Sequence, residues 1–309
     1  MITAPGIFTD IRPDDYLADP CPEPSVTQSI VKTLLEHSPA HARAEHPRLA
    51  LPLPAAVENE TTEKYNKAQA IGDAVHGMLL GRGKTLAVGQ FDSWRGKDPQ
   101  KFKDVAIAEG KTLILEKHWN VANAMYGEAC RQLRERGLHA SFVDFGGSEV
   151  VLAWQEGGAW CRTMIDRLSE DRRHVLDFKS TAMNASPHAV GALMANAGWP
   201  IQAAMHERGL NALDPDNAGR RRHTFILQEQ YPPYALAAYD MREAVMHMGR
   251  KRLELGLCSW FECMRTGVWP AYPIETQYPE LPGWVEQRWL EREETETVTQ
   301  PIDNVLIAG

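Results

Sequence analysis

One stretch of the chain, residues 160–181, most narrows what this protein can fold into. Its sequence, WCRTMIDRLSEDRRHVLDFKST, predicts two β-strands joined by a polar turn. Because side chains alternate between the two faces of a strand, Asp177 and Lys179 point to one face and Phe178 to the other. The second strand therefore ends with a carboxylate and an ammonium group side by side.

The first strand of this stretch adds a second carboxylate. A hairpin that brings Ile165 beside Val175 also brings Asp166 toward the side of Asp177 and Lys179. Carboxylate oxygens are ligands that Mg²⁺ and Mn²⁺ prefer, and a lysine beside them can position a water or hydroxide. This combination is typical of enzymes that cleave phosphodiester bonds.

The composition is that of an ordinary soluble globular protein. The chain has 309 residues, of which 43% are hydrophobic and 24% are charged. It contains no run of 18 apolar residues, so we expect no transmembrane helix and no association with a membrane. The N-terminus lacks a basic region followed by an apolar one and is therefore not a secretory signal, so a cytoplasmic location is expected.

The cysteines and the net charge exclude further classes. The five cysteines are scattered, which argues against a disulfide framework, and their spacing suits neither an iron–sulfur cluster nor a structural zinc site. The net charge of −8 counts against a protein that binds nucleic acid over its whole surface. An enzyme with a local basic groove is still compatible with that charge.

Hydrophobic periodicity and turn residues predict one mixed α/β domain over residues 25–285. An extended or disordered lead-in is expected over 1–24, a loop over 82–105, and an acidic, mobile tail over 286–309. The predicted helices cover residues 27–35, 39–45, 61–81, 114–137, 187–211 with a break near 199–200, and 240–266. The predicted strands cover residues 148–154, 159–168, 174–181, 223–230 and 234–240.

Four polar residues outside the hairpin are further candidates for a site. His76 lies on a predicted helix and can bind a metal through a neutral imidazole, although, taken alone, a core or partly exposed histidine is the favoured interpretation. Glu149 begins the strand before the hairpin, where a charge at the strand edge is the simpler reading. Gln202 and His206 are four residues apart and so share one face of a helix, which can be an exposed polar face or can border the site.

Taken together, five motifs give a family resemblance over about residues 25–210. The chain resembles the PD-(D/E)xK nuclease superfamily, more narrowly its RecB-like exonuclease branch, and most of all the prophage nuclease domains of the exodeoxyribonuclease VIII (RecE-like) type. The resemblance implies a restriction-endonuclease-like core with a small mixed central β-sheet flanked by helices. The matching motifs are SVTQSIVKTLLEHSPAHARAEHP, IGDAVHGMLL, GAWCRTMIDRL, HVLDFKSTAM and WPIQAAMHERGL.

The resemblance also assigns roles to individual residues. It implies that Lys179 orients the attacking water and helps to deprotonate it, and that Glu149 lies at a second metal ion. Catalysis would then depend on Lys179, Asp177, Asp166 and Glu149. The implied ligands of Mg²⁺, for which Mn²⁺ can substitute, are the side chains of His76, Asp166 and Asp177 and the backbone carbonyl of Phe178.

Three residues are the expected contacts with DNA, namely Gln202, His206 and Arg162. Gln202 and His206 occupy the positions of a Q-x-x-x-Y element that lies beside the site and the DNA in the family. This chain has histidine where that element has tyrosine, so the role of His206 is left open.

These features predict a metal-dependent exonuclease that hydrolyses linear double-stranded DNA in phage or prophage recombination. By resemblance, its partners are duplex DNA ends, a single-strand annealing recombinase and further copies of the chain in a ring. Two alternatives stay open: a catalytically silent DNA-binding or recombination-accessory protein on the same fold, and an interaction module whose D-x-K triplet is an ordinary strand feature. Digestion of DNA and stabilisation by metal distinguish the three.

Overall fold

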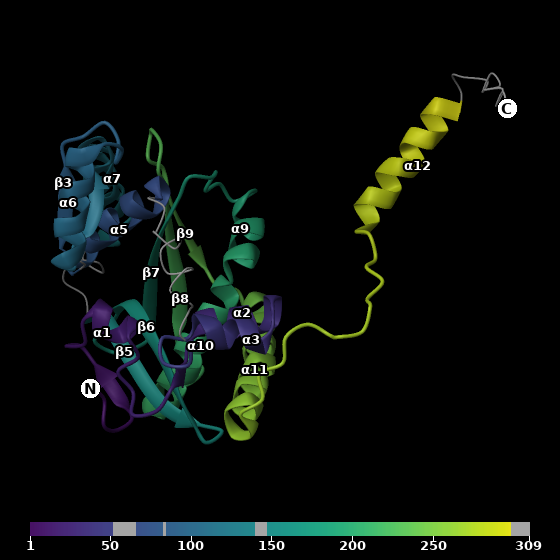
Figure 1. Ribbon diagram of the computed structural model, residues 1–309. Helices are drawn as coiled ribbons and strands as arrows, with labels where there is room; N and C mark the ends of the chain where they lie inside the picture. Colours follow the sequence, from purple (N-terminus) through teal and green to yellow (C-terminus); the bar gives the residue numbers. More distant parts are fainter. Residues whose placement is uncertain (52–65, 83–84, 140–146, 298–309) are drawn as a thin grey trace. The chain divides into compact units, whose positions relative to one another are not determined.

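The computed structural model describes residues 1–51, 66–82, 85–139 and 147–297 (Figure 1). These residues form two compact units, Met1–Ala271 and Tyr272–Gly309. The first unit is a mixed α/β structure that contains every predicted site residue. Within the described ranges, no helix is both long enough and apolar enough to cross a membrane.

A seven-stranded mixed sheet forms the centre of the first unit. Its order is β1-β5-β6-β7-β8-β9, with β2 attached to β6. The pairs β7–β8 and β2–β6 are parallel and the others are antiparallel, which confirms the predicted restriction-endonuclease-like fold class. The strands are β1 (Gly6–Phe8), β2 (Ser25–Val26), β5 (Gly147–Glu156), β6 (Ala159–Leu168), β7 (His174–Thr181), β8 (Arg222–Glu229) and β9 (Leu236–Asp240).

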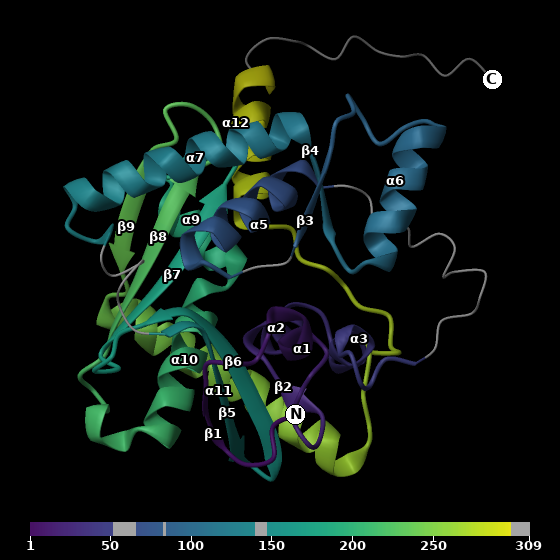
Figure 2. The same ribbon diagram turned by 90° about the vertical axis from the view of Figure 1, so that its left-hand side faces the viewer.

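Helices cover both faces of this sheet. On one face, α5 (Lys67–Leu80) and α7 (Glu116–Glu135) bury an apolar cluster against β7 and β8, and Figure 2 shows both helices lying across these strands. On the other face, a second cluster joins α2, α10 and α11 to β5 and β6. The remaining helices of the unit are α1 (Pro13–Leu17), α2 (Gln28–Glu36), α3 (Pro39–Glu45), α9 (Val190–Ala197), α10 (Trp199–Leu213), the 3₁₀ turn η1 (Pro215–Asn217) and α11 (Glu243–Thr266).

The predicted loop over 82–105 is wrong for most of its length. The chain forms a small parallel sheet from β3 (Leu86–Gly89) and β4 (Thr112–Leu115), with α6 (Lys97–Ala108) between the two strands. A proline such as Pro99 is typical of a loop. Pro99 nevertheless lies in the first turn of α6, where the backbone N–H that proline lacks would have no partner within the helix. The helix predicted from residue 114 begins instead at Glu116, because the two apolar residues before it belong to β4.

The lead-in over residues 1–24 also differs from the prediction. It contains β1, which pairs with β5, and the short helix α1. Ile2, Tyr16 and Cys21 are buried in a cluster against β5 and β6. Asp19 anchors the segment because its carboxylate pairs with Arg162 at 3.0 Å and accepts the Ser25 amide at 2.9 Å. These partners lie far apart in sequence, so local composition does not reveal them.

Other boundaries agree more closely. The predicted break near 199–200 falls at Gly198, whose φ of +76° ends α9 before α10 begins. Residues 61–65 of the predicted helix 61–81 lie outside the described ranges, and the rest forms α5. In the second unit, the described part of the predicted mobile tail belongs to the helix α12 (Gly283–Thr297). Residues 298–309 of that tail lie outside the described ranges.

The contact between α5 and β7 is close because of one glycine. A Cβ atom at Gly72 would lie 2.7 Å from the Ser180 Oγ, so a larger residue would push the helix from the strand. Gln230 joins the two elements further, because its Nε2 donates to Ala68 O at 2.8 Å and contacts Ser180 Oγ at 2.9 Å. The N-terminal half of α5 is thereby fixed beside the end of β7.

Candidate active site

Three buried carboxylates lie in a row across β5, β6 and β7. The β5–β6 register places Glu149 opposite Asp166, and the β6–β7 register places Asp166 opposite Asp177. Each of the three is at most 7% exposed. The hairpin register differs from the predicted one, since Val175 pairs with Leu168 and not with Ile165, but the predicted approach of the two aspartates results all the same.

Asp166 joins three elements of the site. The β6–β7 ladder stops after the pair Arg167–Leu176, and beyond it the Phe178 amide donates to Asp166 Oδ2 at 2.7 Å. The other carboxylate oxygen, Oδ1, lies 3.1 Å from His76 Nε2 on α5. His76 and Asp166, which are 90 positions apart in sequence, are therefore in direct contact.

Asp177 is held from two sides. Gln202 on α10 donates from its Nε2 to Asp177 Oδ2 at 2.9 Å, while Oδ1 forms an ion pair with Lys179. The Lys179 ammonium also lies 5.9 Å from the centroid of the Phe225 ring, in cation–π range. The alternation of β7 accounts for this, because Phe178 packs with α5 and α7 while Asp177 and Lys179 face the other side.

The two aspartates have opposite pKa shifts. Burial, together with the negative charge of Asp166, raises the pKa of Asp177 to about 6, and Lys179 offsets only part of this rise. Burial also acts to raise the pKa of Asp166, but His76, Lys179 and the Phe178 amide outweigh it and lower that pKa. Two carboxylates at one site cannot both be ionised without a compensating cation.

His76 and Lys179 have raised pKa values for the complementary reason. Burial alone would lower the pKa of each, but Asp166 raises that of His76, and Asp177 with Asp166 raises that of Lys179. Lys179 therefore stays protonated at neutral pH. It can stabilise negative charge and donate hydrogen bonds, but it does not take up a proton.

Glu149 is the least satisfied member of the row. Its backbone φ is +51°, a conformation that costs a non-glycine residue free energy and that concentrates at functional sites. Its Oε2 is buried and has no hydrogen-bond partner, and burial, followed by the charge of Asp166, raises its pKa. A buried carboxylate oxygen without a partner is costly unless a ligand completes its surroundings.

Two cavities open at this row. One of about 380 Å³ is lined by Glu149, Asp166 and Gln202, and the other of about 540 Å³ by Lys179 and the residues that follow it. The side chains of Gln69, Asp73 and His76 on α5 line both. The sequence reading missed Gln69 and Asp73, although their spacing from His76 already places all three on one face of a helix.

The residues present fit a divalent cation. Within the described ranges, no three His, Cys, Asp or Glu side chains already surround one point as metal ligands. The donor set nevertheless combines carboxylate oxygens of Asp166 and Asp177 with the His76 imidazole, beside the unpartnered oxygen of Glu149. Oxygen donors of this kind suit Mg²⁺ or Mn²⁺, and a bound cation would relieve the repulsion between the carboxylates.

The expected DNA contact of Arg162 needs correction. This side chain is 3% exposed, and it donates to Ser25 O at 2.7 Å and to Tyr16 O at 3.2 Å while it pairs with Asp19. It fixes the N-terminal segment to β6. An arginine so enclosed does not reach a phosphate at the surface.

His206 is likewise a core residue and not a surface contact. It is 1% exposed, and its Nε2 lies 3.1 Å from the Met164 carbonyl, to which it donates. Burial and the nearby His223 lower the pKa of His206 to about 3, so the ring is neutral. Gln202, one turn earlier, reaches the site, where it orders Asp177 and borders the smaller cavity.

A mixed sheet that carries a row of buried carboxylates, with a lysine two residues after the last of them, defines a nuclease-like protein of the PD-(D/E)xK class. The family model described as PDDEXK-like domain of unknown function (DUF3799) matches residues 29–281. The chain belongs to this family, and the predicted superfamily is confirmed. No curated protein sequence matches the chain.

One of the similar solved structures shows the same fold. A protein from Eubacterium rectale, whose assignment as an exonuclease is provisional, is 10% identical, with a TM-score of 0.56 over 88% of this chain and 96% of that one. The alkaline exonuclease of Laribacter hongkongensis is 11% identical over 89% of this chain and 95% of that one. Its TM-score of 0.23 is too low to support an argument.

The neutral His206 predicts a pH-dependent loss of stability. In the folded protein the pKa of His206 is about 3, which is below the ordinary value of 6.5. As the pH falls below 6.5, the unfolded state therefore binds a proton at this residue while the folded state does not. At about pH 5 this destabilises the protein by about 2 kcal/mol. Urea unfolding of the wild type and of His206→Gln, which keeps an N–H donor, measures the effect.

We expect the wild type to lose this much more stability than His206→Gln between neutral pH and about pH 5. Other titrating groups, including His223, are present in both proteins and cancel in the difference. Parallel pH profiles for the two proteins would contradict the assignment of a neutral, buried His206.

Proposed function

We propose that this protein is a metal-dependent exonuclease that hydrolyses phosphodiester bonds of linear double-stranded DNA. The observation that carries the proposal is the row of Glu149, Asp166 and Asp177 with Lys179 beside it, open to two cavities. A core that only needs stability does not retain several mutually repelling carboxylates, because each unpaired buried charge is expensive. In a site that binds a cation and a phosphate, these carboxylates serve as ligands of the cation.

The chain's own residues divide the work. Asp166, Asp177, His76 and the Phe178 carbonyl would hold Mg²⁺, which supplies Lewis-acid activation of water and of the phosphodiester. Lys179, kept protonated by Asp177, donates to the attacking water and stabilises negative charge that develops on the phosphate. Gln202 keeps the Asp177 carboxylate oriented. Glu149, with a raised pKa and an oxygen without a partner, is placed to accept the proton of the water.

Arg82 replaces Arg162 as the basic residue that we assign to DNA. It directly follows the C-terminal cap of α5, is exposed, and its charge acts on Glu149. A chain with a net charge of −8 needs such local positive charge at its site, because phosphate contacts dominate non-specific affinity. A ring of subunits and a recombinase partner are predictions from the sequence resemblance, as is a role in phage recombination.

Digestion of DNA tests the proposed activity. Linear duplex DNA with an end label is incubated with Mg²⁺ and with the wild type, Asp177→Asn or Lys179→Met. We expect both variants to lose at least about 100-fold in rate, because Asp177→Asn removes a ligand charge from the metal site and Lys179→Met removes a charge that acts on the reacting phosphate. Glu170→Gln, an exposed acid in the turn of the same hairpin, is the matched control and should digest at the wild-type rate.

Closed circular DNA is the second arm of this experiment. An exonuclease degrades the linear form alone, and the position of the label gives the direction. Equal rates on linear and circular DNA would show that the protein is an endonuclease and not an exonuclease. Undiminished digestion by both variants would overturn the site assignment altogether.

Salt dependence tests the role of Arg82. If its guanidinium contacts one phosphate, Arg82→Gln lowers the slope of log K against log salt by about 1. Fluorescence anisotropy with a labelled duplex, in Ca²⁺ to prevent cleavage, measures the slope. Arg265→Gln removes an exposed arginine whose guanidinium is paired with Glu262 and should leave the slope unchanged. Equal slopes for wild type and Arg82→Gln would exclude the contact.

A further inference from the structure

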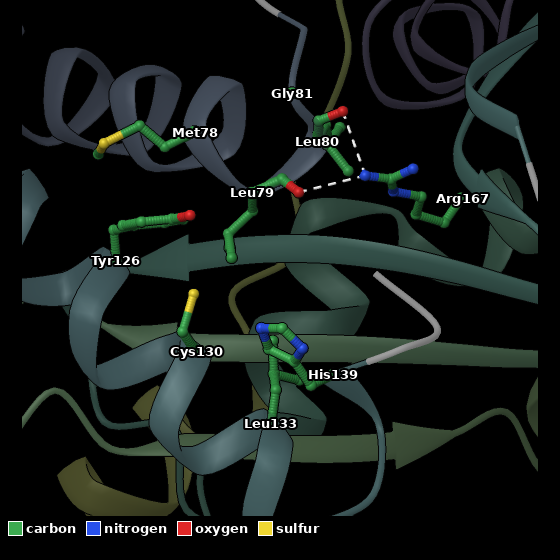
Figure 3. Close-up of a pocket in the computed structure, with 9 residues that line it drawn as sticks. All are labelled: Met78, Leu79, Leu80, Gly81, Tyr126, Cys130, Leu133, His139 and Arg167. Atoms are coloured by element: carbon green, nitrogen blue, oxygen red, sulfur yellow. Dashed lines mark hydrogen bonds between the residues drawn. The ribbon is translucent and has the colours of Figure 1, made fainter. Parts of the chain in front are cut away.

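A buried arginine of the sheet binds the C-terminus of α5 (Figure 3). Arg167, on β6, reaches the last turn of the helix, where its Nη2 donates to Leu79 O at 3.3 Å and to Leu80 O at 3.2 Å. Ser148, on β5, donates from its Oγ to Leu80 O at 2.8 Å. Two neighbouring strands of the sheet thus bind the final carbonyl groups of one helix.

These contacts are favourable for two physical reasons. The last carbonyls of a helix have no partner within the helix, and a guanidinium supplies donors for them. The positive charge also complements the negative end of the helix dipole. Arg167 is only 7% exposed, so water screens this interaction little.

Packing leaves space at this end of α5, although Leu79 and Leu80 are themselves buried in the apolar cluster with α7. A cavity of about 270 Å³ lies beside it, lined by Met78 and Leu79 of the helix and by Tyr126 and Cys130 of α7 (Figure 3). A helix end with space beside it can shift without a clash when its hydrogen bonds are removed. The position of the last turn therefore depends on the donors from the sheet as well as on the burial of Leu79 and Leu80.

The same turn of the helix is coupled to the candidate active site. Leu80 is four residues after His76 and lies on the same side of the helix, and Arg167 directly follows Asp166. The strand β6 consequently holds α5 twice, once through Asp166 at the His76 ring and once through Arg167 at the helix end. The second contact sets the height of the imidazole relative to the carboxylate.

We infer that Arg167 and Ser148 are positioning residues that hold His76 at the metal site through the C-terminus of α5. Neither contacts the reacting atoms. The charge of Arg167 also acts on Asp166 and Glu149, but removing a positive charge there would strengthen the binding of a cation, so a loss of metal affinity reports the position of the imidazole. The metal part of this inference rests on the proposed function. Groups that orient metal ligands in this indirect way commonly change metal affinity by about 10- to 100-fold when they are removed.

The first test measures the affinity for Mn²⁺ by isothermal titration calorimetry. Arg167→Met keeps the bulk of the side chain but removes its donors, and we expect it to weaken Mn²⁺ binding by about 10-fold or more. Arg167→Lys keeps one charged donor and should fall between that variant and the wild type. Wild-type affinity in a folded Arg167→Met would overturn the inference.

Arg221 offers a matched control. It is also a buried arginine at the end of a helix, where it donates to Leu210 O at 3.4 Å and pairs with Asp214, but α10 carries no expected metal ligand. Arg221→Met should lower the unfolding temperature without weakening Mn²⁺ binding. An equal loss of affinity in Arg221→Met would show that general destabilisation, and not the position of His76, is responsible.

A second readout needs no metal. In ¹⁵N-histidine-labelled, metal-free protein, the ring resonances of His76 should shift in Arg167→Met and, less strongly, in Ser148→Ala, while Arg221→Met leaves them in place. Ser148→Ala removes a single hydrogen bond. If Arg167→Met does not fold, the His76 resonances in Ser148→Ala test the inference. Unmoved His76 resonances in the folded variants would overturn the inference. If the wild type binds no Mn²⁺, the proposed function fails, and the resonances alone decide the inference.

Discussion

The hydrogen bond from the Phe178 amide to the Asp166 carboxylate is the interaction on which the site depends. It replaces the backbone ladder between β6 and β7, which stops at the pair Arg167–Leu176. Where strands pair fully, backbone groups satisfy one another and side chains are not needed. Where these two strands separate, the Asp166 carboxylate takes over as acceptor, so a side chain that accepts a hydrogen bond is needed in the sheet at that position.

The remaining features of the site follow from this buried acid. A carboxylate in a low-dielectric interior needs positive partners, which His76 supplies from α5 and Lys179 from β7. Asp177, directly opposite, then has a raised pKa because it is buried and because its neighbour is ionised. The arrangement is stable enough to fold, yet it keeps a surplus of negative charge and an unpartnered oxygen on Glu149. A divalent cation would supply the positive charge and the ligand that these carboxylates lack.

Sequence alone predicted the parts of this structure that depend on local periodicity. Strand alternation placed Asp177 and Lys179 on one face, and hydrophobic spacing located α3, β7 and α11 closely. The expected ligand role of His76 came only from the family resemblance, because its contact with Asp166 joins residues that are 90 positions apart in sequence. Arg162 and His206 were misjudged because their partners, Tyr16 with Ser25 and Met164, come from distant segments. Burial of a polar residue by such contacts leaves no local pattern.

The most direct test of the account is the position of a bound metal. Anomalous diffraction at the manganese absorption edge, from a crystal grown with Mn²⁺, locates the ion without assumptions about activity. The account predicts a peak between the carboxylates of Asp166 and Asp177 and the His76 imidazole, and its loss in an Asp166→Asn crystal. A peak elsewhere, with none at the acidic row, would contradict the assignment of this row as the catalytic metal site.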